Sequence, residues 1–153
     1  MTAKERVLRA IAHQETDRVP VHIHLTPEIG AKLKEALKGR NPAECFSDLR
    51  FVGAVYRGKT RKPEPGSGVD SYDQWGIGYR RVSNEFGTYS EAVEWPWAKL
   101  HTLSAAADYP WPKASDFDFS GIPAACERLK GFPIVFGGAG TPDIINGTSR
   151  GRG

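Results

Sequence analysis

Two stretches of the chain combine an apolar run typical of a β-strand with a helix start that follows shortly after it. The first run is 19–25, where apolar residues alternate with proline and histidine, and it leads into Thr26-Pro27-Glu28. The second run is 133–136, which lacks alternation, as expected of a strand buried on both faces, and precedes Thr141-Pro142-Asp143. A threonine cap, a proline at the first helical position and an early acidic residue favour helix initiation. Buried strands followed by capped helices are typical of a parallel fold, so we predict the α/β class.

The first twelve residues predict a further helix. Thr2 and Glu5 form a T-x-x-E capping box, in which each side chain binds a backbone N–H near the other. At helical spacing, an apolar face of Val7, Leu8 and Ile11 is expected opposite a water-facing set of Lys4, Arg6 and Arg9.

Periodicity and turn chemistry also predict elements in the rest of the chain. We expect helices at 26–38, 41–49 and 122–129, a strand at 51–56, a loop at 58–68, and a hairpin of strands 75–82 and 88–95. Glycines 137–140 predict a tight turn from strand to helix. The helix begun at 141 is not expected to develop, because the residues from 147 onward provide no apolar face.

Length and composition exclude several classes of protein. A chain of 153 residues suits one domain, and 39% apolar residues are too many for a disordered tail. Scattered basic residues with a net charge of +3 argue against nucleic-acid and membrane partners, and no apolar run approaches a membrane span. Two cysteines give neither a disulfide framework nor a metal spacing. Since no secretory signal is visible, we expect a cytoplasmic protein.

A parallel α/β fold rarely stops after two or three strands, yet the sequence starts one more unit at Thr141. We therefore expect residues 1–153 to form a single incomplete domain, the N-terminal part of something larger.

Several blocks in chain order carry a family resemblance: Lys4-Glu5-Arg6-Val7-Leu8, Asp17-Arg18-Val19-Pro20-Val21, Asp48-Leu49-Arg50-Phe51-Val52, Asp73-Gln74-Trp75-Gly76 and Tyr109-Pro110-Trp111-Pro112. In order and spacing they resemble the N-terminal portion of the uroporphyrinogen decarboxylase-like (URO-D) family, over about residues 2–140. The resemblance implies a partial (β/α)8 TIM barrel. In that frame 19–25 is the first strand, 58–100 is an elaborated connection with an inserted β-hairpin, and 133–136 is a later strand.

The resemblance implies one of two enzyme classes. One branch of the family is a carboxy-lyase of porphyrin biosynthesis, which decarboxylates uroporphyrinogen without a cofactor. The other is a methyltransferase that moves methyl groups to or from a corrinoid with a zinc-bound thiol acceptor. Residues 22–27 lack the arginines with which the first branch binds substrate carboxylates, and no His-x-Cys of the second branch's zinc site is present. We slightly prefer methyl transfer on the first of these grounds.

Several expectations about ligands and activity follow from the resemblance. The substrate of a full-length relative is a porphyrinogen or a methyl donor, and a corrinoid protein is a possible partner. We expect no cofactor and no metal in this chain; zinc and a corrinoid belong to a full-length methyltransferase-type relative. Because strands of the barrel are missing, the chain alone is expected to be inactive. The alternative is a non-enzymatic small α/β module completed by a partner chain.

No catalytic residue is assigned, but two histidines are candidates for substrate binding. His22 and His24 share one face of the predicted strand, near the barrel mouth. Two imidazoles there could bind a substrate carboxylate, relay a proton or ligate a metal. The structural alternative is a pair of hydrogen-bonded core or rim histidines.

Three charged residues are further candidates. Asp48 and Arg50 lie at a junction of helix and strand, where they would pair with each other or with a ligand, or form a structural ion pair or cap. Asp73 precedes the hairpin, where aspartate commonly caps a turn through its side chain.

Overall fold

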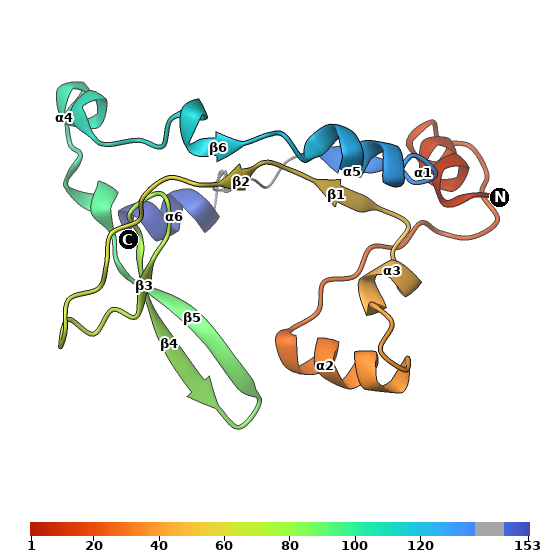
Figure 1. Ribbon diagram of the computed structural model, residues 1–153, viewed down its shortest axis with the longest axis horizontal. Coiled ribbons are helices and arrows are strands. Elements are labelled where there is room, and N and C mark those ends of the chain that lie inside the picture. Colours follow the sequence, from red (N-terminus) through yellow and green to blue (C-terminus); the bar gives the residue numbers. More distant parts are fainter. Residues whose placement is uncertain (137–145) are drawn as a thin grey trace. The chain divides into compact units, whose positions relative to one another are not determined.

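The computed structural model describes residues 1–136 and 146–153 as short helices and strands (Figure 1). They divide into two compact units: unit 1 holds residues 1–53 and 120–136, and unit 2 holds 54–119 and 146–153. Within the described residues the sheets have two or three strands and none closes into a barrel. No helix in the same residues is both long and apolar enough to cross a membrane. The mixed α/β class is thus confirmed, whereas the single incomplete domain stays a prediction.

The helices of unit 1 begin where the sequence predicts: α1 (Ala3–Ile11), α2 (Pro27–Ala36), α3 (Pro42–Phe46) and α5 (Ile122–Arg128). Both halves of the capping box of α1 form. The Glu5 N–H donates to the Thr2 hydroxyl at 3.2 Å, and the Thr2 N–H donates to the Glu5 carboxylate at 2.8 Å. Thr26 and Asn41 cap α2 and α3, each followed by a proline at the start of the helix. These starts depend on local hydrogen bonds, which is why local sequence predicts them.

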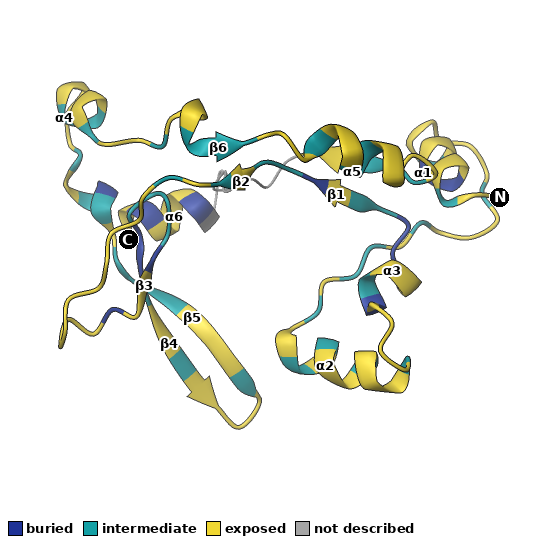
Figure 2. Cartoon of the chain, in the orientation of Figure 1, coloured by how far each residue is buried: buried dark blue, intermediate teal, exposed yellow. Residues whose placement is uncertain are grey.

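The predicted faces of these helices are only partly correct. Of the apolar face of α1, Val7 is buried, but Leu8 and Ile11 are 54% and 70% exposed. No residue of α2 is buried, and Figure 2 colours most of this helix as exposed. Helical spacing predicts which side chains share a face, but only the neighbouring elements decide whether that face is covered.

The predicted strand at 19–25 is wrong, because this described segment pairs with no strand. Its N–H groups bind side chains instead of a neighbouring backbone. The Val21 N–H donates to the Asp48 carboxylate at 2.8 Å, and the Ile23 N–H donates to the Ser47 hydroxyl at 3.1 Å. One backbone bond, from the Asp48 N–H to the Val21 carbonyl at 2.7 Å, completes the connection. The alternating pattern predicts an extended chain but not the partner of each N–H.

Two short strands of unit 1 pair in parallel: β1 (Arg50–Val52) and β7 (Ile134–Phe136), with Phe51 opposite Val135. The predicted strand at 133–136 is therefore confirmed. Its predicted burial on both faces is wrong, since Val135 is 37% and Phe136 62% exposed. The reason is that β1 is the single strand beside β7 within the described residues.

Unit 2 contains the predicted hairpin. Strands β4 (Gly78–Asn84) and β5 (Gly87–Glu94) are antiparallel, and β3 (Ser71–Tyr72) adds a third strand beside β4. The predicted strand at 51–56 is wrong as one element. Its first part is β1 of unit 1, while its second part, β2 (Val55–Tyr56), pairs antiparallel with β6 (Phe117–Asp118) in unit 2.

Around the three-stranded sheet, unit 2 is mostly loop and short helix, with α4 (Leu103–Asp108) and the 3₁₀ helices η1 (Pro96–Lys99) and η2 (Ala114–Asp116). Its buried apolar residues are Ile77, Val69, Tyr72 and Trp97. The predicted loop at 58–68 is confirmed. Arg61 fastens this loop to the sheet, because its guanidinium pairs with Glu94 at 3.0 Å and lies 4.6 Å over the Tyr72 ring.

Residues 146–152 form a helix, α6 (Asn146–Arg152), so the expectation that none develops here is wrong. The helix packs on η1. Gly147 and Gly151, one turn apart, are both buried, and a Cβ at Gly151 would overlap the Trp97 ring. Because glycine has no side chain, these two residues let α6 approach η1 closely without an apolar face. The predicted turn at 137–140 and helix start at 141–143 lie outside the described residues.

We expect Gly151→Ala to detach α6 from Trp97, because the added Cβ overlaps the indole ring. Overpacking of this kind costs about 1–3 kcal/mol. The detachment should appear as greater quenching of tryptophan fluorescence by acrylamide. Gly30→Ala is the matched control: a Cβ there meets no atom within 4 Å, and alanine should stabilise α2 by up to about 1 kcal/mol. Equal quenching in both variants would contradict the packing of α6.

Candidate functional site

Asp48 is the most constrained charged residue of unit 1, with 3% of its surface exposed. Arg6 donates to its carboxylate at 2.8 Å, and Arg18 donates through two nitrogens at 2.7 and 2.8 Å. The Val21 N–H completes the set. A buried carboxylate requires such compensation, because removing a lone charge from water is strongly unfavourable.

Asp17 extends this group into a cluster of four charges, Arg6–Asp17–Arg18–Asp48, which we call the Asp48 cluster. Arg6 donates to Asp17 through Nε at 2.6 Å and through a second nitrogen at 2.8 Å. That hydrogen bond lowers the pKa of Asp17 well below its usual range and raises the pKa of Arg6. Burial opposes ionisation of Asp48, but the hydrogen bonds from Arg18 and Val21 outweigh it, so the pKa of Asp48 is also lowered.

The Asp48 cluster shows that the predicted exposure of Arg6 is wrong, and it identifies the partners of Asp48. Arg6 does not face water but is buried at 7% exposure, because two carboxylates compensate its charge. Asp48 pairs with Arg6 and Arg18 rather than with Arg50. Its oxygens are occupied by hydrogen bonds inside unit 1, so the geometry favours a structural ion pair over a ligand contact.

Arg50, at the start of β1, is held by backbone carbonyls. Its Nη1 donates to Ser47 and Leu49 at 2.7 and 2.9 Å, and its Nη2 donates to Glu44 at 3.0 Å. The guanidinium also lies 3.9 Å over the Phe132 ring. These carbonyls follow from the early end of α3, whose last turn leaves acceptors free. Arg50 therefore ties α3 to the sheet and leaves its charge at the edge of a pocket.

The two candidate histidines lie side by side, with ring centroids 4.5 Å apart in an edge-to-face arrangement. His22 also lies 5.0 Å from the Phe51 ring. Both ring nitrogens of His22 are buried and have no hydrogen-bond partner among the described residues. His24, in contrast, is exposed. An imidazole in this state has an unused donor and an unused acceptor, which is unfavourable unless a ligand or water provides the partners.

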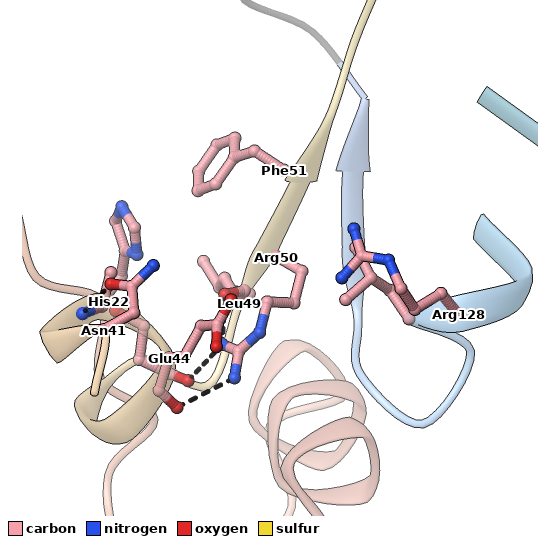
Figure 3. A pocket seen from close by; sticks show the side chains of 10 residues that line it. His22, Asn41, Glu44, Leu49, Arg50, Phe51 and Arg128 are labelled. Atoms are coloured by element: carbon pink, nitrogen blue, oxygen red, sulfur yellow. Dashed lines mark hydrogen bonds between the residues drawn. The ribbon is translucent and has the colours of Figure 1, made fainter. Parts of the chain in front are cut away.

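A pocket of about 220 Å³ opens beside His22, and we call it the His22 pocket. Its polar lining comes from His22, Asn41, Glu44, Ser47, Arg50 and Arg128. Figure 3 shows His22 and Asn41 on one side of Arg50, with Arg128 on its other side. Arg128 is exposed, and its guanidinium has no hydrogen bond or ion pair with any described residue. The pocket lies at the amino end of β1, since Leu49, Arg50 and Phe51 line it.

The chemistry of this lining suits a small anion better than a metal ion. Its lining includes two arginines, Arg50 and Arg128, and one acidic residue, Glu44. Guanidinium groups bind carboxylates in paired geometry, and an imidazole N–H can donate to the same group. Within residues 1–136 and 146–153, no three His, Cys, Asp or Glu side chains form a group that could hold a metal. The described residues therefore do not by themselves fit a zinc site.

Asp73 belongs to unit 2, where it holds the turn before β4. Its carboxylate accepts from the N–H groups of Trp75 and Ile77 at 2.9 and 3.0 Å, and from the Tyr79 hydroxyl at 3.1 Å. Burial raises the pKa of Tyr79, and the Asp73 charge adds to the effect. Asp73 thus has the capping geometry that the sequence suggests, with its acceptors turned toward its own loop.

Sequence reasoning missed Arg6, Arg18 and Arg128 as partners of these sites. A signal existed for Arg18 and Asp17, since two adjacent charges sit just before an apolar run. Nothing in the local sequence identifies Arg128, because it meets the His22 pocket only when α5 packs beside β1.

We expect Asp48→Asn to destabilise the protein by about 3 kcal/mol, because Arg18 loses its charged partner and the buried Arg6 keeps only Asp17. Urea unfolding at neutral pH measures the free energy. Glu127→Gln, at an exposed pair with Lys130 in the same unit, is the control and should change stability by less than about 0.5 kcal/mol. Equal losses in both variants would contradict the role of the Asp48 cluster.

The same cluster predicts acid sensitivity. The pKa values of Asp17 and Asp48 are lower in the folded chain than in the unfolded one. Their contribution to stability is therefore fully present above about pH 4 and is lost as the pH falls through the folded values. Urea unfolding at a series of acidic pH values should show this loss. The free energy of unfolding should fall less steeply with pH in Asp48→Asn than in the unchanged protein. Parallel curves for the two proteins would argue against it.

No protein-family model, no curated protein and no solved structure matches this chain. The resemblance to the URO-D family therefore depends on the sequence blocks themselves, and what it implies about activity is a proposal.

Proposed function

We propose that this chain supplies strand–helix units of a uroporphyrinogen decarboxylase-like enzyme built on a (β/α)8 barrel. The reaction is decarboxylation of a porphyrinogen or corrinoid-dependent methyl transfer. The observation that carries the proposal is the parallel pairing of β1 with β7, with α5 in contact with β1. Parallel strands connected through helices are the repeating unit of such barrels.

The exposed side chains of this strand pair support the same proposal. Phe51, Val135 and Phe136 are 53%, 37% and 62% exposed in the described structure. Parallel sheets are normally covered on both faces, so these side chains favour further strands or helices that pack against β1 and β7. A covered sheet of this kind is what a larger barrel would provide.

In this proposal the reaction takes place at the carboxyl ends of the strands, where barrel enzymes carry their active sites. Of the candidate residues, His24 is the histidine with an exposed side chain, in the extended segment 19–25 that pairs with no described strand. We assign His24 to substrate binding through its ring nitrogens. The His24 ring lies 4.5 Å from the His22 ring, so the His22 pocket at the amino end of β1 adjoins this histidine.

The two reactions require different groups around the substrate. The segment 22–27 contains no arginine that could bind a porphyrinogen carboxylate, which supports methyl transfer. Zinc and a corrinoid would supply the methyl-accepting chemistry of that branch. Since the described residues do not fit a zinc site, no step is assigned to the metal here.

The second candidate is a non-enzymatic α/β module completed by a partner chain, and the exposed apolar residues of β1 and β7 favour it as well. The two candidates differ in stability. A module should unfold cooperatively and be monodisperse, whereas separated barrel strands should aggregate through their unpaired edges. Circular dichroism with a thermal melt distinguishes the two.

The direct test is a titration of the purified 153-residue chain with uroporphyrin and, separately, with cobalamin, followed by absorbance. We expect one of them to bind, and His24→Ala to weaken that binding by roughly fivefold through loss of one hydrogen bond. His101→Ala, at an exposed histidine of unit 2, is the control and should change nothing. Binding of neither ligand, or equal effects of both variants, would overturn the proposal.

An activity assay completes the test. The chain alone should release no carbon dioxide from uroporphyrinogen and transfer no methyl group from methylcobalamin to a thiol. Turnover in either assay would contradict the expectation that the site needs further strands.

A further inference from the structure

We propose that unit 1 binds a small monocarboxylate with an aliphatic chain, in a site formed by the His22 pocket and an adjoining apolar groove. This inference does not depend on the barrel proposal, because it follows from the residues that line two hollows of unit 1 and not from the pairing of β1 with β7. It assigns a ligand class to a surface at the amino end of β1.

The apolar groove has a volume of about 340 Å³ and is lined by Val7, Ala10, Ile11, Pro20 and Val21. His22 and Leu49 line both the groove and the His22 pocket, so the two hollows adjoin along these side chains. The groove by itself falls within the roughly 300–1,000 Å³ typical of small-ligand sites. The lining changes from aliphatic at α1 to cationic at β1 and α5.

The polar end supplies what a carboxylate requires. His22 borders this end, but both of its ring nitrogens are buried and unpartnered among the described residues, so the cationic contacts come from the arginines. Arg128 has no protein partner in the same residues, and Arg50 adds a second positive charge. Glu44 opposes an anion, but two guanidiniums against one carboxylate leave the lining cationic. An amine of the same shape would lose these contacts and be repelled by the arginines.

The apolar end supplies what an aliphatic chain requires. Ile11 is 70% and Val21 40% exposed at the groove, so a chain lying there would remove their apolar surface from water. The groove contains no charged side chain. A ligand with one carboxylate and a linear chain therefore matches both ends of the site.

The test is calorimetric titration of the full chain with octanoate and with octylamine. We expect octanoate to bind at least tenfold more tightly than octylamine. Arg128→Gln should weaken octanoate at least fivefold, while Arg9→Gln, at an exposed arginine of α1, leaves it unchanged. Equal affinities for octanoate and octylamine, or equal effects of the two arginine variants, would overturn the proposal.

A second pair of variants tests the groove. Ala10→Phe should fill it and weaken octanoate at least tenfold, whereas Ala31→Phe on the exposed surface of α2 should not. If Ala10→Phe does not fold, a series from butanoate to octanoate replaces it. Affinity should then rise by up to about fourfold per methylene group. A series without any rise would contradict a groove that holds the chain.

Discussion

The buried carboxylate of Asp48 is the interaction on which unit 1 depends. It joins Arg6 of α1, Arg18 of the following turn and the Val21 N–H, and it lies just before β1. The charges compensate one another, so a position that would be unfavourable for any one of them alone becomes a junction of three segments. Unit 1 has few buried apolar residues among those described. This polar junction therefore provides part of the stabilisation that an apolar core provides in other small folds.

The position of His22 follows from that junction. Hydrogen bonds from Val21 to Asp48 and from Ile23 to Ser47 hold the segment on both sides of His22. The imidazole then lies against Phe51 with its nitrogens unpartnered, while Arg50 is held by the carbonyls at the end of α3. The side-chain hydrogen bonds that segment 19–25 makes in place of strand pairing therefore position His22, which lines the proposed ligand site.

The two proposals depend on different features of unit 1, although β1 and α5 belong to both. The barrel proposal depends on the parallel strands β1 and β7 and on their exposed apolar side chains. The ligand proposal depends on the amino end of β1, on α1 and on Arg128. Asp73 of unit 2 supports neither proposal, because its carboxylate binds N–H groups of its own turn. Failure of one proposal would leave the other intact.

The sequence by itself determined the elements that local chemistry controls. The capping box at Thr2 and Glu5, the proline starts of α2 and α3 and the hairpin in unit 2 depend on residues a few positions apart, so their patterns predict them. Tertiary structure decided the rest. The burial of Arg6, the side-chain partners of 19–25, the approach of α6 to Trp97 and the meeting of Arg128 with the His22 pocket all join residues distant in the chain. Periodicity shows which residues share a face, but the partner that covers or binds this face lies elsewhere in the sequence.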